Sequence, residues 1–452
     1  MVQLDSSVVA IALPSMARAF AVRPVDLSIG ITIYVLVQAV FLPSSRWIAD
    51  RFGARSVFVA ALAAFTAASV LCGLSRSLPQ FVAARIAQGL AAALMTPVAR
   101  VVLLQATPKE DLLRVMTITS VPMLIAPTIG PAVGGFITTY LSWPWIFLLN
   151  VPIGALGLVL TLRLLPHVGA KARQPFDLSG FLLLGGAVAA VLSGFDQVSE
   201  SGSDWRIGSA ICIAGAVLAY FAVRHLHRRE HPLISLQPAR IHTYFATTIG
   251  GGALIRLPVR SAAFILPLLF QIVLGYSALQ AGLLLLAMNG GDLALKSLTS
   301  RTLRRFGFRR VILTSAGAML VALAACAAFS SLTPGWIIVA VLAVAGMGRS
   351  LLFTAMSTLA FADVPESEFS SASVLWNVTQ QATNALGVTL AAIALNAAAA
   401  HAGQATGHLT LHACRMALLL MAVIGAISLP SFLRLHPDAG AAVSGHVLSG
   451  AR

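Results

Sequence analysis

The stretch DRFGARSVF at residues 50–58 is echoed by RRFGFRRVI at residues 304–312. Both copies follow a long apolar segment and share the pattern Arg-Phe-Gly-x-Arg-x-Val, which indicates an internal repeat. The copies lie 254 residues apart. At roughly 32 residues for a membrane span with its loop, this offset corresponds to eight spans. A plain duplication of six-helix halves would place the echo six spans later, so we predict two helices inserted between the halves.

The composition excludes an ordinary water-soluble protein. Hydrophobic residues make up 58% of the 452 residues and charged residues only 10%, against about 25% charged residues in a typical soluble domain. Apolar stretches of about 20 residues, long enough to cross a bilayer, recur along the whole chain. We therefore predict an all-α integral membrane protein with spans near residues 1–20, 28–48, 56–75, 79–104, 114–140, 145–163, 177–197, 207–224, 241–274, 277–299, 309–330, 335–360, 369–398 and 410–433.

The net charge of +15 would indicate a nucleic-acid partner in a soluble protein. Here the positions of the charges give another explanation. With the amino end inside, nineteen of the thirty Lys and Arg fall in inner loops, four fall outside and seven fall within spans. That imbalance is the positive-inside signature. We predict a multi-pass protein of the inner (cytoplasmic) membrane, with both termini cytoplasmic and with no nucleic-acid partner.

Other site classes find little support. The four cysteines stand singly in apolar segments, which excludes a disulfide framework and paired zinc ligands. We expect the loop histidines to be solvated, with no metal and no cofactor; they are His225, His227, His231, His401, His408 and His412. The first apolar stretch keeps only sixteen residues, Leu4 to Ala19, against about 20 for a full span. We therefore expect the first helix to be truncated, through either an upstream start or a shortened chain.

Four stretches resemble signatures of the fourteen-helix drug–proton antiporters of the major facilitator superfamily, the EmrB/QacA/MdtD-like branch. Later pieces also resemble this branch, at 176–184, 266–286 and 349–363, so the resemblance covers nearly the whole chain in order. It implies two six-helix bundles plus two inserted helices. The four signature stretches are LDSSVVAIALPSMA (4–17), RWIADRFGAR (46–55), RIAQGLAAALMTP (85–97) and GPAVGG (130–135), the last followed by YLSWPWIFLLNVPIG (140–154).

The second signature implies a gating loop that latches the bundles on the cytoplasmic side. Its residues here are Arg46, Asp50, Arg51, Gly53 and Arg55. Carboxylates are favoured at helix N-termini and pair with guanidinium groups, which suits a latch that forms and breaks. Arg46 departs from the family's glycine, so it either snorkels to the inner surface or changes how the latch packs. The alternative is that the loop has no gating role and its basic residues only reflect the positive-inside distribution of charge.

Two further signatures suggest residues on the transport path. Arg85, Gln88 and Gly89 form the helix-4 motif, and an arginine inside a membrane almost always faces a polar interior. The resemblance implies a role near the proton or substrate path, and a structural tether to backbone carbonyls is the alternative. The fourth signature is the antiporter motif, which comprises Gly130, Pro131, Gly134 and Gly135. The resemblance implies that this motif restricts leakage through the protein between its outward and inward states. The alternative is that glycine and proline are simply common in membrane helices.

Asp5 is the carboxyl that we expect to carry protons. It stands alone on an otherwise apolar helix, and burial disfavours the charged form of a carboxyl, which suits a group that alternately binds and releases a proton. We predict that Asp5 and Arg85 together form the proton-coupling machinery. The alternative is a structural Asp near a fraying helix end.

Several polar residues are candidates for the cavity lining. Asp292 and Lys296 stand four apart and can form a structural ion pair or take part in transport. Arg256 and Arg260 also share one helix face, and two unpaired cations there would favour anionic or zwitterionic cargo. The other ionisable residues in or near spans are Arg100, Arg349 and Arg415. The predicted cavity lining is Gln38, Arg256, Arg260, Asn377 and Gln381. For Asn377 and Gln381, polar contacts between helices are an equal alternative.

We therefore predict three segments: an N-terminal six-helix bundle (1–163), two inserted helices with flanking loops (164–240), and a C-terminal six-helix bundle with a short tail (241–452). The predicted function is proton-coupled export of small amphipathic or drug-like molecules by alternating access, with no enzyme activity. Its predicted partners are the small-molecule substrate, protons and the lipid bilayer. Whether it also uses a periplasmic adaptor is left open by the sequence.

Three alternatives to that function remain. A porter for a specific metabolite or siderophore would use the same scaffold. An integral-membrane transferase would need a carboxylate cluster of the DDxxD type, and the fifteen Asp and Glu residues are never clustered in that way. The third alternative is a non-transporting fragment, suggested by the short first helix.

Overall fold

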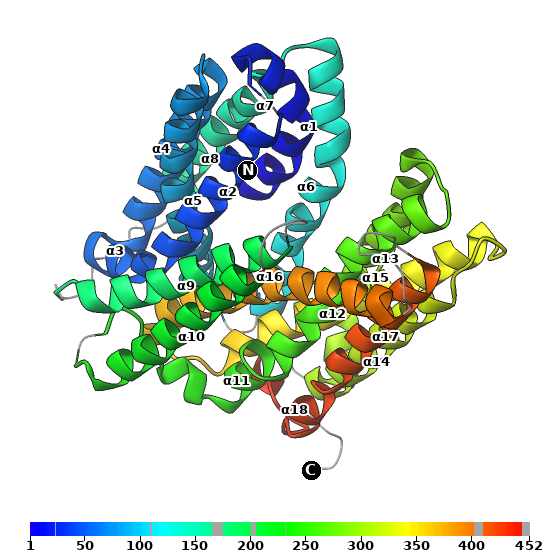
Figure 1. Ribbon diagram of the computed structural model, residues 1–452. Coiled ribbons are helices and arrows are strands. Elements are labelled where there is room, and N and C mark those ends of the chain that lie inside the picture. The colour runs from blue at the N-terminus through cyan, green and yellow to red at the C-terminus, as the bar shows by residue number, and fades with distance from the viewer. Residues whose placement is uncertain are drawn as a thin grey trace.

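A computed structural model describes residues 1–22, 24–108, 111–164, 175–199, 205–230, 232–401 and 410–444. All regular secondary structure of these residues is helical. The first bundle, drawn in blue to cyan in Figure 1, consists of α1 (Val2–Phe20), α2 (Pro24–Phe41), η1 (Leu42–Ser44), α3 (Ser45–Phe52), α4 (Ala54–Leu74), α5 (Leu78–Ala106), α6 (Leu112–Tyr140), α7 (Trp145–Leu148) and α8 (Asn150–Leu164).

Close helix contacts hold this bundle together. Within it, α5 packs against α2 and α4, and α1 packs against α6. Small residues permit these approaches. A Cβ at Gly134 of α6 would lie 3.0 Å from the Val8 side chain of α1, and one at Gly89 of α5 would lie 2.8 Å from the Tyr34 carbonyl oxygen of α2. Two signature glycines therefore serve as helix contacts.

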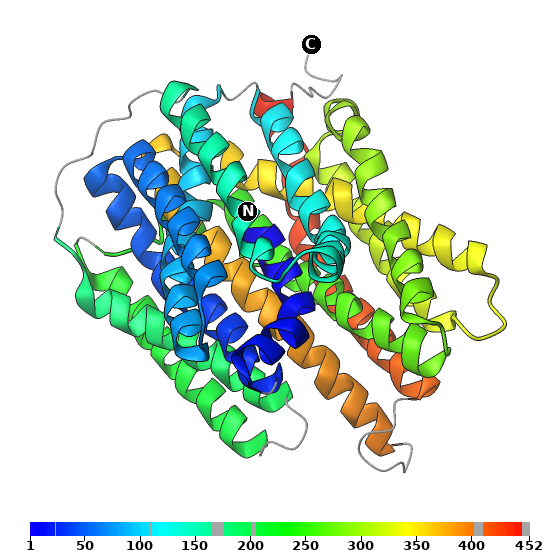
Figure 2. The same ribbon diagram turned by 90° about the horizontal axis from the view of Figure 1, so that it is seen from above.

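Two helices separate the bundles in the sequence and touch both of them in space. They are α9 (Leu178–Ser199) and α10 (Trp205–Arg228), which pack against each other along their length. The α9 helix also packs against α2 of the first bundle and α16 of the second. In Figure 2 the green pair lies at the periphery of the molecule.

The second bundle follows η3 (Gln237–Arg240). It begins as α11 (His242–Thr248) and α12 (Gly251–Leu268), which continues into a π-helical turn, η4 (Leu269–Val273). The long α13 starts at a capping box, in which Ser277 and Gln280 each bond the other's backbone N–H. The remaining elements are α13 (Ala278–Phe306), α14 (Phe308–Ala325), η5 (Cys326–Ala328), α15 (Gly335–Ala362), η6 (Glu366–Glu368), α16 (Phe369–His401), α17 (Leu411–Ala426), α18 (Leu429–Leu433) and α19 (Ala441–Ser444).

The echoed stretches have the same local structure. Gly53 ends α3 and begins α4 with φ 84°, and Gly307 ends α13 and begins α14 with φ 74°. Only glycine adopts such a φ without strain, so each echo needs a glycine at its sharp bend. The repeat read from the sequence therefore corresponds to one structural device used twice.

The number of membrane spans is confirmed only in part. Ten helices of the described residues are long and apolar enough to cross a membrane, and each lies at one of the fourteen expected places. The other four expected spans, near 1–20, 114–140, 277–299 and 369–398, are helical as α1, α6, α13 and α16. The count of fourteen stays a prediction.

The two bundles meet near the connection between α5 and α6. Leu104, Leu112 and Met116 from this connection are buried in the apolar core of the second bundle. Nearby, the Ser373 hydroxyl of α16 donates to the Pro97 carbonyl oxygen of α5 at 3.0 Å. The cluster at the opposite end of the first bundle, which includes Phe81, contains residues of that bundle only. The described residues therefore pack the bundles together at the α5–α6 end, which we call the closed end.

Candidate functional site

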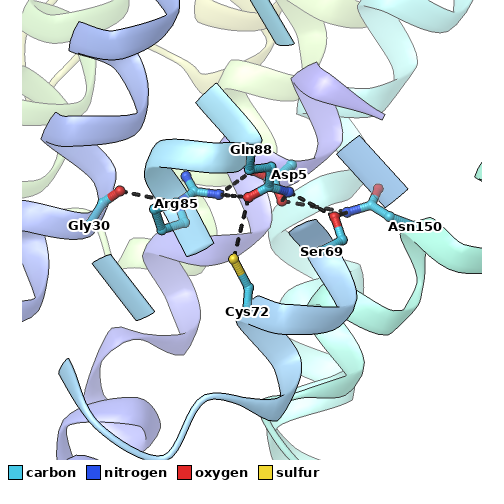
Figure 3. A network of polar contacts seen from close by, with 7 residues as sticks. All are labelled: Asp5, Gly30, Ser69, Cys72, Arg85, Gln88 and Asn150. Carbon is cyan, nitrogen blue, oxygen red and sulfur yellow. Dashed lines mark hydrogen bonds and ion pairs between the residues drawn. The ribbon is translucent and has the colours of Figure 1, made fainter. Parts of the chain in front are cut away.

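A buried ion pair joins the first and fifth helices of the N-terminal bundle. The Asp5 Oδ2 atom of α1 lies 2.7 Å from Arg85 Nη1 of α5, and neither side chain is exposed to solvent (0% each). The Arg85 Nε atom also donates to the Gly30 carbonyl oxygen of α2 at 3.1 Å. Figure 3 shows the two side chains pointing toward each other between the helices. The structure thus places the predicted coupling residues in direct contact.

Gln88 completes a triangle with this pair because it lies one helical turn after Arg85. Its Nε2 atom donates to Asp5 Oδ1 at 3.1 Å, and its Oε1 atom accepts from Arg85 Nη1 at 2.6 Å. The same Nε2 atom contacts Ser69 Oγ of α4 at 2.8 Å. The helix-4 motif therefore supplies both the counter-ion of Asp5 and an amide that bridges the two charges.

Residues that were not predicted from the sequence surround this triangle. Asn150 Nδ2 of α8 donates to Asp5 Oδ1 at 3.5 Å and to Ser69 Oγ at 3.3 Å. The Tyr34 ring of α2 lies under the guanidinium group, 4.1 Å from Arg85 Cζ to the ring centroid. Asn150 and Tyr34 are both lone polar residues in apolar stretches, a signal that was available but weak.

The network contains hydrogen-bonding groups for either protonation state of Asp5. Three buried polar atoms of the network make no hydrogen bond in the described structure: Tyr34 Oη, Arg85 Nη2 and Asn150 Oδ1. Ionised Asp5 accepts from Arg85, Gln88 and Asn150, which stabilises its charge. Protonated Asp5 would become a donor, and the amide oxygen of Asn150 could accept that proton if the amide turns. Both the ionised and the protonated form of Asp5 therefore have hydrogen-bond partners among the neighbouring side chains.

In the gating loop, Arg46 pairs with the motif's own carboxylate. Its Nε atom lies 3.5 Å from Asp50 Oδ2, one turn later on α3. Arg55 Nη2 donates to the Leu162 carbonyl oxygen at 2.6 Å, and Arg51 lies over the Trp47 ring at 5.1 Å. The α3 helix packs against α16 of the other bundle. The loop is thus positioned where the bundles meet.

The antiporter motif lies on α6 beside α1. Gly130 and Gly134 are buried, and Gly135 is half-buried. The Pro131 side chain lies outside the described residues. Because α6 approaches the helix that carries Asp5 through Gly134, a larger residue there would push α1 away from the ion pair.

A second buried polar cluster lies between α13 and α15. Asp292 Oδ2 lies 3.0 Å from Arg349 Nε, and Asp292 Oδ1 lies 3.8 Å from Lys296 Nζ. Lys296 also donates to Thr354 Oγ1 at 2.9 Å, and Arg349 Nη2 donates to Asn289 Oδ1 at 3.0 Å. The ion pair that the spacing of Asp292 and Lys296 allows is present, and Arg349 adds a second cation that the sequence did not link to it.

The five predicted cavity residues fall into different surroundings. Gln38 is buried on α2, Arg256 is buried on α12, and Arg260 is exposed one turn later. Asn377 Nδ2 donates to the Ser373 carbonyl oxygen of its own helix at 2.8 Å. Gln381 lines an apolar cavity of about 180 Å³ between α2, α9, α10 and α16.

Among the described residues there is no group of three or more His, Cys, Asp or Glu side chains that could hold a metal. One predicted solvated histidine has a partner, since His225 Nε2 of α10 lies 2.9 Å from Asp177 Oδ1. That carboxylate is 48 residues away in the sequence, which is why local spacing gave no signal for it. His231 lies outside the described residues.

Comparison with known proteins places this architecture in a family. A model described as Major Facilitator Superfamily matches residues 1–388 and, in a second match, residues 248–447. The chain belongs to the major facilitator superfamily. It is therefore a membrane transporter and not an enzyme.

Relatives and structural neighbours of this major facilitator protein agree with that assignment. A Serratia proteamaculans (strain 568) protein named "Putative multidrug resistance protein MdtD" is 35% identical over 442 residues, covering 96% of this chain and 91% of the relative. A Klebsiella pneumoniae (strain 342) protein of the same name is 37% identical over 399 residues, covering 87% of this chain and 83% of the relative.

Two solved structures share the major facilitator fold at low identity. The human organic anion transporter MFSD10 (TETRAN) superposes with a TM-score of 0.62 and 14% identity, covering 95% of this chain and 96% of that chain. The proton:xylose symporter XylE superposes with a TM-score of 0.61 and 13% identity, covering 97% of this chain and 94% of that chain. At such identities the likeness shows the fold alone.

Proposed function

We propose that this major facilitator protein is a proton-coupled exporter of small amphipathic or drug-like molecules. The observation that carries the proposal is the fully buried pair of Asp5 and Arg85, which joins two helices of one bundle. The names of the MdtD relatives and the four signature stretches support drugs as the cargo and export as the direction of transport.

Proton binding would change how the N-terminal bundle is held. While Asp5 is ionised, its carboxylate ties α1 to α5, α2 and α8 through Arg85, Gln88 and Asn150. A proton on Asp5 removes its charge, and Arg85 then keeps only neutral partners: Gln88, the Gly30 carbonyl oxygen and the Tyr34 ring. A buried, uncompensated guanidinium is costly, so the bundle would favour another arrangement. The free-energy cost of leaving that charge uncompensated is large enough to shift the equilibrium between two states of the transporter.

The joined bundles support alternating access. Apolar packing and a hydrogen bond unite the bundles at the closed end, whereas the Phe81 cluster at the other end belongs to one bundle. By the excess of Lys and Arg in its loops, the closed end is the cytoplasmic one. We propose fourteen spans in the cytoplasmic membrane with both termini inside, so that this arrangement is an outward-facing state.

The test is transport in proteoliposomes with an imposed pH gradient. Wild-type protein should export fluorescent drug-like dyes and release protons when dye is added. Asp5→Asn should abolish dye-induced proton release yet leave dye binding measurable. Asp438→Asn, which changes an exposed carboxylate, is the matched control and should behave as wild type. If Asp5→Asn still exports dye uphill with normal proton release, Asp5 is not the coupling group, and Asp292→Asn and Asp50→Asn become the variants to test.

A further inference from the structure

Two arginines from opposite bundles lie against one tryptophan. Arg100 Cζ of α5 lies 5.3 Å from the Trp376 ring centroid, and Arg256 Cζ of α12 lies 4.5 Å from the same centroid. Arg100 Cζ also lies 5.5 Å from the Phe361 ring centroid. Trp376 itself is buried on α16. Two cations and two aromatic rings thus meet where the N-terminal and C-terminal bundles join.

Neither arginine has an anionic partner in the described part of the chain. Arg256 is 4% exposed, and its Nη1 atom donates to the carbonyl oxygens of Thr248 and Gly252 at 3.2 and 2.6 Å. Its Nη2 atom is buried without a hydrogen-bond partner, and so is Arg100 Nη1. The nearby Tyr244 hydroxyl donates to the Ala372 carbonyl oxygen. A buried cation without a counter-ion is strongly disfavoured.

The two arginines belong to different bundles. Arg100 lies on α5 of the N-terminal bundle, and Arg256 and Trp376 lie on α12 and α16 of the C-terminal bundle. Pro97, one helical turn before Arg100, accepts the hydrogen bond from Ser373 that joins the bundles. Packing the bundles together here brings two like charges toward one ring, and they repel in a medium of low dielectric. Cation–π contact with the ring offsets only part of this repulsion.

We propose that the carboxylate of an organic anion binds between Arg100 and Arg256, with an apolar or aromatic body against Trp376 and Phe361. Guanidinium groups recognise carboxylates through paired N–H donors, and the two unpartnered Nη atoms are available donors. The bound anion neutralises both cations, so cargo binding favours closure of this end. The proposal deepens the proposed export function by naming a class of cargo, and it rests on that function only for the transport role of the site.

The test is ligand-dependent thermal stability of the purified full chain in detergent. Benzoate is the probe, because it combines a carboxylate with an aromatic ring, and benzamide at equal ionic strength is its uncharged counterpart. Benzoate should raise the midpoint of unfolding in a saturable manner, and benzamide should not. Arg100→Gln and Arg256→Gln should each weaken benzoate binding at least tenfold. Arg301→Gln, which removes an exposed arginine of α13, should bind benzoate as wild type does.

Three results would overturn the site: equal stabilisation by benzoate and benzamide, unchanged binding by Arg100→Gln, or equal weakening by Arg301→Gln. Arg100 decides the matter even if Arg256→Gln misfolds, since Arg100 Nη1 makes no hydrogen bond in the described structure, whereas Arg256 Nη1 bonds two backbone carbonyl oxygens. Asp5→Asn should bind benzoate normally. Loss of proton coupling in Asp5→Asn therefore tests the export function, and loss of benzoate binding in Arg100→Gln tests the anion site.

Discussion

The carboxylate of Asp5 and the guanidinium of Arg85 lie 2.7 Å apart with no exposed surface, although 80 residues separate them in the chain. Desolvation of two such charges is repaid only by close geometry and additional hydrogen bonds. Gln88 and the Gly30 carbonyl oxygen supply those bonds. Removing either charge alone leaves the other buried without compensation, so the two residues should act as one unit.

Their mutual dependence can be measured by a double-mutant cycle. Arg85→Gln alone should lower the free energy of unfolding by about 3–5 kcal/mol, because Asp5 is left charged and buried. Combining it with Asp5→Asn should restore part of that loss, since the remaining amides can bond each other. Thermal unfolding of the four proteins in detergent gives the interaction energy. Additive losses would show that the two residues are energetically independent.

Asn150 should tune the pair without being essential to it. Its amide contacts Asp5 and Ser69 at the long distances of 3.5 and 3.3 Å. Asn150→Leu should therefore slow substrate-induced proton release without abolishing it, as measured with a pH-sensitive dye in proteoliposomes. Asn150→Asp should be more harmful, because it places a second carboxylate beside Asp5. Equal effects of the two substitutions would argue against a role for the amide at Asp5.

Charged residues made half of this site predictable. Asp5 and Arg85 stand out because a charge in an apolar stretch is rare and needs a partner. Asn150 and Tyr34 did not stand out, since uncharged polar residues are tolerated in membrane helices and their partners come from other helices. The pairing of Arg46 with Asp50 follows from spacing on one helix, whereas the approach of Arg100 and Arg256 to Trp376 depends on how the bundles meet.

The fold was predictable for a related reason. Long apolar stretches are local signals, and helices lie where these stretches predicted them. The division into two halves with an insert, read from the two Arg-Phe-Gly echoes, stays a prediction. The contact of α9 with both α2 and α16 is a tertiary property without a local signal.

Arg46 occupies the place of the family's glycine and should influence the rate of transport. Because the Arg46–Asp50 pair is partly exposed, losing it should cost no more than about 1 kcal/mol of stability. Arg46→Gly should change the rate of dye export with normal amounts of protein in the membrane. Arg46→Ala separates two causes: a change in both variants assigns the effect to the lost ion pair, and a change in Arg46→Gly alone assigns it to closer packing. Unchanged export in both would mean that Arg46 only reaches toward the membrane surface.

The ends of α10 give a direct test of the membrane topology. Arg206 and Arg229 are exposed near the two ends of this helix. In a chain without its native cysteines, Arg206→Cys should react with an impermeant maleimide added outside intact cells, and Arg229→Cys should react only after lysis. The reverse pattern would overturn the proposed orientation, and labelling of both from outside would show that α10 does not cross the membrane.

Asp177 should anchor the inserted helices in a pH-dependent manner. It is 3% exposed, just before α9, and joins three segments. Its Oδ1 atom accepts from the Gly180 N–H at 3.0 Å and contacts His225 Nε2 of α10 at 2.9 Å, and its Oδ2 atom accepts from the Leu233 N–H at 3.2 Å. Burial alone would raise the pKa of Asp177, but these hydrogen bonds outweigh it and hold the pKa below its ordinary value.

A carboxyl with a depressed pKa in the folded state stabilises that state above its unfolded pKa, near 3.9, and loses this contribution as the pH falls through the folded pKa. Asp177→Asn should therefore unfold a few degrees below wild type at pH 7, and the gap should narrow as the pH approaches 3. Asp438→Asn controls for the loss of one surface carboxylate and should show no such gap at any pH. Thermal unfolding across this range decides the point, because a gap that stays constant down to pH 3 would mean that the charge on Asp177 contributes nothing to the anchor.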